Sequence, residues 1–223
     1  MPLSPRCRPL FLARFLSYRF LSLLLALLIL LVASPLTGND VLDHAAVAVL
    51  LSILLFTTVI AASTARHIRW IAATLATGSG IVIFIGLALE HRVIYLPVVA
   101  LFTAYLAYTI GVVLRRMVVT TEIDADILCG AAAIYFLIGV VWAMTYWLIY
   151  ELDKGAFTAA AALAVPPFRF HQFLYYSFSS LTTLGIGDIT PVNSFAQIWT
   201  TLETATGNLY IALLVARLVS LYR

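Results

Sequence analysis

Residues 179–188, with the sequence SSLTTLGIGD, form the segment that decides the fold. Glycine stands at alternate positions, Gly185 and Gly187, and an acidic residue, Asp188, follows the second glycine. Glycine adopts unusual φ values at little cost, so this pattern permits a short segment whose successive carbonyl groups turn to the same side. Carbonyl oxygens arranged in this way can replace the water around a cation.

The composition predicts an integral membrane protein. Of the 223 residues, 63% are hydrophobic and 10% are charged, against about 25% charged residues in an ordinary soluble domain. A helix needs about 20 mostly apolar residues to cross a bilayer, and the chain supplies that length several times. The formal charge is +3, but all but one of the 13 basic residues are arginines scattered around hydrophobic spans. That distribution sets membrane topology and does not indicate nucleic-acid binding.

Apolar runs between polar breaks predict six membrane-spanning helices: 20–36, 45–62, 71–89, 93–114, 126–150 and 196–222. A shorter apolar stretch, 168–183, lies between the last two spans and is marginal as a full crossing. This stretch suits a re-entrant helix at 168–181 followed by a loop. The expected fold class is therefore an all-α, multi-pass membrane protein with six spans and one re-entrant pore loop.

Basic residues collect in the tail and in alternate connections, which predicts that these parts face the cytoplasm: Arg6, Arg8, Arg14, Arg19, Arg66, Arg69, Arg115 and Arg116. Both termini are then cytoplasmic. A second interpretation takes the first span as a cleaved signal peptide, because Val32, Ala33 and Ser34 follow a leucine-rich run. Against it, the basic segment before the run is long, and removing one span breaks the even count of crossings.

The segment from Thr182 to Asp188 closely resembles the selectivity filter of potassium channels, Thr-Val-Gly-Tyr-Gly-Asp. The resemblance implies that backbone carbonyls bind K⁺ as the permeant ion, that no cofactor is needed, and that Asp188 lies at the outer mouth. One loop cannot close a cage, so a ring of several subunits is needed, and the resemblance implies assembly with three further copies of the same chain. The carbonyls that would bind K⁺ belong to Thr183, Leu184, Gly185 and Ile186, with Gly187 completing the filter and Thr182 supporting it.

Residues 127–223 are similar to the pore domain of small bacterial channels of this superfamily, with an outer helix, a pore helix, the filter and an inner helix. The resemblance implies a bacterial inner membrane, that is, a plasma membrane. Three parts precede this domain: a basic cytoplasmic segment at 1–19, a four-helix transmembrane domain at 20–114 and a cytoplasmic linker at 115–126. The alternative is that Gly-Ile-Gly-Asp is only a turn, but the flanking spans and the aromatic helix before it favour a pore loop.

Several other residues are candidate supports of the filter, each with a plainer alternative. Tyr175 and Tyr176 lie where the family packs aromatic residues behind the filter, or are ordinary interfacial aromatics. Glu203 either hydrogen-bonds behind the filter or stays hydrated near the outer interface. Gly207 is a candidate hinge of the inner helix, although close helix packing explains it equally well. Arg217 is expected to extend to lipid headgroups.

The predicted function is a potassium-selective channel without steep voltage gating, because the fourth span, 93–114, carries no Arg or Lys. A poorly selective cation channel is the alternative, since Ile186 replaces the usual aromatic residue of the filter. A membrane-embedded enzyme is a further alternative. Its candidate catalytic pairs have no recognised metal-ligand spacing: Asp43 with His44, and Glu90 with His91.

Overall fold

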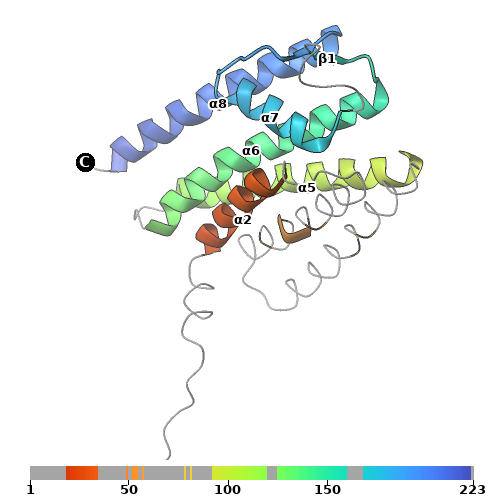
Figure 1. The fold of residues 1–223 in the computed structure, drawn as a ribbon. Helices are drawn as coiled ribbons and strands as arrows, with labels where there is room; N and C mark the ends of the chain where they lie inside the picture. The colour runs from red at the N-terminus through yellow and green to blue at the C-terminus, as the bar shows by residue number, and fades with distance from the viewer. Residues whose placement is uncertain are drawn as a thin grey trace, which may run out of the picture.

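The computed structural model describes residues 19–34, 92–119, 125–159 and 168–221, and the isolated positions 49, 52–54, 57, 78 and 81. Two of the helices in these ranges are long and apolar enough to cross a membrane, over Leu96–Arg115 and Asp126–Leu152. Figure 1 shows the arrangement of the elements: α2 (Arg19–Ala33), α5 (Arg92–Val119), α6 (Ala125–Leu152), β1 (Phe157–Ala159), α7 (Phe170–Leu181), β2 (Ile189–Pro191) and α8 (Ser194–Leu221).

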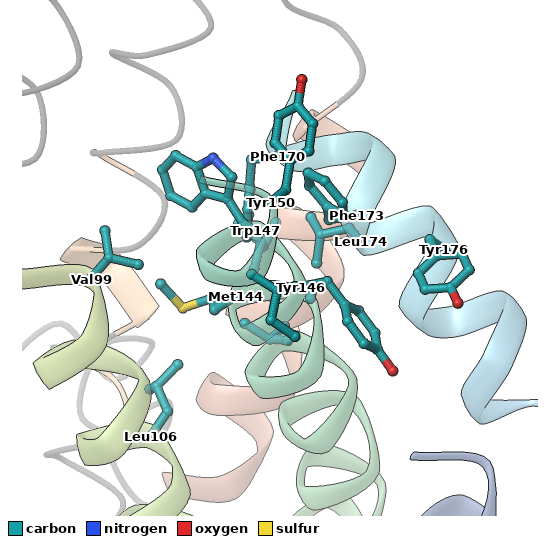
Figure 2. Close-up of a cluster of buried hydrophobic side chains, with 14 of the residues drawn as sticks. Val99, Leu106, Met144, Tyr146, Trp147, Tyr150, Phe170, Phe173, Leu174 and Tyr176 are labelled. Carbon is teal, nitrogen blue, oxygen red and sulfur yellow. The ribbon is translucent and has the colours of Figure 1, made fainter. Parts of the chain in front are cut away.

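Helix α6 is the centre of the fold, because it packs against α2, α5, α7 and α8. Its aromatic side chains Tyr146, Trp147 and Tyr150 are buried in the main hydrophobic cluster. Figure 2 shows residues of α5, such as Val99, and of α7, such as Phe173, reaching the same cluster from either side. Burial of large aromatic and aliphatic side chains thus joins the short helix α7 to the long helices.

The predicted helices at 20–36, 93–114, 126–150, 168–181 and 196–222 are all present, with shifted ends. Helix α2 stops at Ala33 because Pro35 disfavours helical backbone at the residue before it. Helix α5 continues to Val119, so the first five residues of the predicted linker 115–126 are helical. The predicted spans 45–62 and 71–89 lie outside the described residues, apart from isolated helical positions.

Contacts between helix ends give the relative direction of the helices. The backbone N–H groups of Phe20 and Leu21 donate to Asp126 Oδ1, at 3.1 and 3.4 Å, so α2 and α6 begin side by side. Near the other end of the chain, the Tyr210 hydroxyl donates to the carbonyl of Ala131 at 2.7 Å. The start of α2, the start of α6 and the end of α8 therefore lie toward one end of the molecule (Figure 1).

Specific capping bonds fix the starts of α7 and α8. The side chain of Gln172 accepts the backbone N–H of Arg169 at 2.7 Å, which begins α7 at Phe170. The Asn193 side chain accepts the N–H of Ala196 at 2.7 Å and so caps α8.

Strands β1 and β2 pair antiparallel, with Thr158 opposite Thr190. This two-stranded sheet was not predicted from the sequence. It ties the segment after α6 to the segment after the glycine-rich loop.

Candidate ion-conducting filter

The loop after α7 has three residues with positive φ at alternate positions. Thr183 has φ 60°, Gly185 has φ 59° and Gly187 has φ 80°. Glycine adopts this conformation readily, whereas a non-glycine residue pays a steric cost of about 1–2 kcal/mol. Thr183 is the only non-glycine residue with positive φ in the part of the chain that the structure describes. The surrounding hydrogen bonds must hold it there.

Three successive backbone N–H groups of this loop point at one residue of α7, Ser179. The N–H groups of Leu184 and Gly185 donate to the Ser179 carbonyl, at 2.9 and 3.1 Å. The N–H of Ile186 donates to Ser179 Oγ at 3.3 Å. In a trans peptide the N–H and the preceding C=O point in opposite directions. The carbonyls of Thr183, Leu184 and Gly185 therefore face away from α7, toward one common side.

The loop side chains are uncovered within the single chain. Leu184 is 66% exposed and Ile186 is 54% exposed. A cavity of about 720 Å³ lies beside them, between the end of α2, the outer face of α7 and the loop. Tyr175 and Asp188 both line this cavity and interact with each other. Tyr176 differs from Tyr175: it is buried, and its hydroxyl is 2.7 Å from Thr200 Oγ1.

Helix α8 runs alongside the second half of α7. The contacts come in the same order on both helices, from Tyr176 with Thr200 to Ser180 with Thr204, whose hydroxyl donates to the Ser180 carbonyl at 3.1 Å. At the end of α7, Gly207 lies against Leu181. Because α7 carries the loop, α8 positions the loop through these contacts.

Glu203 lies between the first and last of these contacts and is fully buried. The Tyr146 hydroxyl of α6 is 2.6 Å from Glu203 Oε2, and Ser177 Oγ of α7 is 2.5 Å from Oε1. The carboxyl group thus joins three helices behind the loop. Its burial argues against the alternative of a hydrated carboxylate near the outer interface.

Close helix contact is the geometric role of two glycines. A Cβ atom at Gly207 would lie 2.5 Å from the Leu181 carbonyl oxygen, and one at Gly139 would lie 2.6 Å from the Phe178 ring. Gly207 lies within the uninterrupted helix α8. The packing explanation for Gly207 therefore has direct support, and the hinge stays a prediction.

The sequence alone did not single out Ser177, Ser179 or Tyr146 for the roles described above. Hydroxyl residues are common in apolar helices, and only the packing selects these three. The pairs Asp43 with His44 and Glu90 with His91 lie outside the described residues. Within the described ranges, no cluster of His, Cys, Asp and Glu is able to hold a metal ion.

A family model described as an ion channel matches residues 127–223, from the start of α6 to the end of the chain. This stretch is an ion channel domain of the potassium-channel pore-loop superfamily. The match indicates a channel rather than an enzyme, and with the two apolar helices it indicates a membrane protein. No curated protein and no solved structure matches the chain.

Proposed function

We propose that the chain is one subunit of a tetrameric channel that conducts K⁺ passively and selectively across the plasma membrane. The observation that carries the proposal is the orientation of the loop backbone: three successive N–H groups bind Ser179, so the opposite carbonyls face one side. Such a row of oxygens suits a dehydrated cation, since selectivity filters replace the hydration shell with backbone carbonyls.

Uncovered apolar surface supports assembly. Leu184 and Ile186 of the loop are exposed in the single chain, and neighbouring copies around a central axis would cover them. Helix α8 also exposes large apolar side chains, which suits contact with lipid and with other subunits: Phe195, Ile198, Leu202, Leu209, Ile211, Leu213, Val215 and Val219.

The helix directions support a topology with both termini in the cytoplasm. The start of α2 and the end of α8 lie toward the same end of the molecule as the start of α6. An even number of crossings gives this result, and six is the number that we propose, with the four-helix domain at 20–114 preceding the pore domain.

The test is the reversal potential of the reconstituted protein in a planar bilayer with opposed K⁺ and Na⁺ gradients. A value near the K⁺ equilibrium potential, lost in Gly185→Ala, is the expected result. Gly185 has φ 59° and no atom within 4 Å of the added methyl group, so this substitution acts through backbone strain at the filter and not through a clash. Gly155→Ala, in the outer connection, serves as the matched control.

A poorly selective cation channel is the second candidate, and one observation favours it. The side chain between the two filter glycines is Ile186, which has no hydroxyl to hydrogen-bond to the surrounding helices. In the described loop, the Ile186 N–H is held by its bond to Ser179 Oγ. A reversal potential near zero, with current still sensitive to Gly185→Ala, would select this candidate.

A further inference from the structure

The carboxyl group of Glu203 has a partner at each oxygen and no contact with a cation among the described residues. Tyr146 approaches Oε2 from α6, and Ser177 approaches Oε1 from α7. All three side chains are fully buried. The other ionisable groups that face the carboxyl are also tyrosines, Tyr135 from α6 and Tyr176 from α7. None of these groups offers a positive charge to a carboxylate.

A count of protons gives the state of the carboxyl group. Ser177 Oγ is 2.5 Å from Glu203 Oε1 and also 2.8 Å from the carbonyl oxygen of Gly139. A serine hydroxyl has one proton, and a carbonyl oxygen is only an acceptor. One Ser177 proton cannot serve both contacts, so an ionised Glu203 would leave one of these two short oxygen–oxygen contacts without a proton. A proton on Glu203 satisfies both contacts at once, because Ser177 then donates to Gly139 and accepts from Oε1.

We propose that Glu203 is a positioning residue of the pore that works as a neutral carboxylic acid. This inference rests on the proposed channel function. The acid donates its proton from Oε1 to Ser177 Oγ, Ser177 donates to the Gly139 carbonyl, and Tyr146 donates to Oε2. One continuous chain of hydrogen bonds then connects α8, α7 and α6. A neutral acid also avoids the cost of a buried, uncompensated charge.

This chain of hydrogen bonds acts on the filter through α7. Ser177 lies two residues before Ser179, which binds the N–H groups of the filter. Residues on either side of Glu203 also hold α7, because Thr200 binds Tyr176 and Thr204 binds the carbonyl of Ser180. The acid therefore fixes the position of the segment of α7 that directly precedes the filter loop.

The first experiment uses infrared spectroscopy on the full-length wild-type protein at neutral pH. The C=O stretch of a protonated carboxyl group is expected, and it should be absent in Glu203→Gln. Ordinary Asp and Glu side chains are ionised at this pH and do not contribute to that band. Absence of a Glu203-dependent band would overturn the proposal, whatever current the channel carries.

The second experiment compares two substitutions by single-channel recording. Gln copies the neutral acid, because its amide can donate to Ser177 and its carbonyl can accept from Tyr146. Glu203→Gln should keep the open probability within about twofold of wild type, whereas Glu203→Ala should lower it about tenfold by leaving buried hydroxyls without partners. An equal loss of open probability in both variants would overturn the proposal, because Gln should replace the neutral donor.

Matched controls separate this inference from the proposed function. Tyr146→Phe removes the hydroxyl that binds Glu203, whereas Thr145→Val removes a neighbouring hydroxyl that bonds only within α6. Only Tyr146→Phe should shift the infrared band of Glu203, and a shift in both variants would overturn the assignment. If the wild-type protein shows the infrared band but no K⁺ selectivity, the proposal of a K⁺-selective channel is overturned and the neutral acid still stands.

Discussion

Gly207 of α8 lies directly against the carbonyl oxygen of Leu181, the last residue of α7. A methyl group at position 207 would lie 2.5 Å from that oxygen and 2.9 Å from Leu181 Cδ1. Because this oxygen belongs to the helix backbone, it cannot move away from an added methyl group as the end of a flexible side chain would. The distance between α8 and α7 is therefore set by the absence of a side chain at one position.

Gly207→Ala should separate α8 from α7 and destabilise the protein. Overpacking of this kind costs about 1–3 kcal/mol. Gly111→Ala in α5 is the matched control, because no atom lies within 4 Å of its added methyl group and the exchange should be neutral or stabilising. The measurement is thermal unfolding in detergent. Equal Tm values for the two variants would contradict the packing role, while altered gating with unchanged Tm would favour a hinge.

Ser179→Ala should weaken K⁺ selectivity without abolishing it. The substitution removes the Oγ acceptor of the Ile186 N–H but keeps the carbonyl that binds Leu184 and Gly185. Loss of one hydrogen bond of about 0.5–1.5 kcal/mol predicts a two- to tenfold fall in the K⁺ over Na⁺ permeability ratio. Ser220→Ala, whose hydroxyl bonds to Arg217 of its own helix, should leave the ratio unchanged.

Asp126→Ala should loosen α2 from α6. The carboxylate caps the first turn of α2 from a different helix, and loss of a cap costs about 1 kcal/mol. Asp126→Asn keeps an acceptor oxygen and should retain most of the stability. Chemical denaturation in detergent measures the stability of both variants. An equal loss of stability in the two would mean that the charge of Asp126, and not capping, is the cause.

Thr158→Cys combined with Thr190→Cys should form a disulfide on mild oxidation. The two residues are directly opposite in the antiparallel sheet, where Cα atoms lie about 4.5–5.5 Å apart, within the range of disulfides. A background with Cys7 and Cys129 changed to Ser removes the native thiols. A mobility shift on a non-reducing gel, absent from each single variant, is the expected result. No shift in the double variant would contradict the register.

The conductance should depend only weakly on voltage. No Arg or Lys occurs between positions 93 and 114, so α5 carries no row of charges to move in the membrane field before Arg115. Macroscopic current recorded over a range of potentials in symmetric K⁺ is the measurement. A steep conductance–voltage curve would place a voltage sensor elsewhere in the chain.

The helices were predictable because each is an apolar run that ends near a polar or helix-breaking residue. The end of α2 near Pro35 and the start of α7 near Phe170 are each within three residues of the predicted position. The strands β1 and β2 were not predictable, because each has three residues and their pairing joins positions 30 or more residues apart. Such short strands carry no periodicity of their own.

The candidate site was only partly predictable for a similar reason. The glycine spacing of the filter lies within a few adjacent residues, so the sequence alone marks Gly185 and Gly187. The partners of Glu203 come from two other helices, and nothing near Tyr146 or Ser177 in the sequence distinguishes them from other hydroxyl residues. Contacts of this kind depend on how α6, α7 and α8 meet, which a linear pattern does not contain.

Hydrogen bonds from within the chain shape the backbone of the candidate filter. Ser179 holds the three N–H groups, and the strained residue Thr183 lies two residues after the end of α7. On the assembly proposed above, a newly made subunit already carries its own part of the filter in a folded form. Assembly then joins preformed parts, and a failure to oligomerise leaves folded subunits in the membrane that conduct no ions.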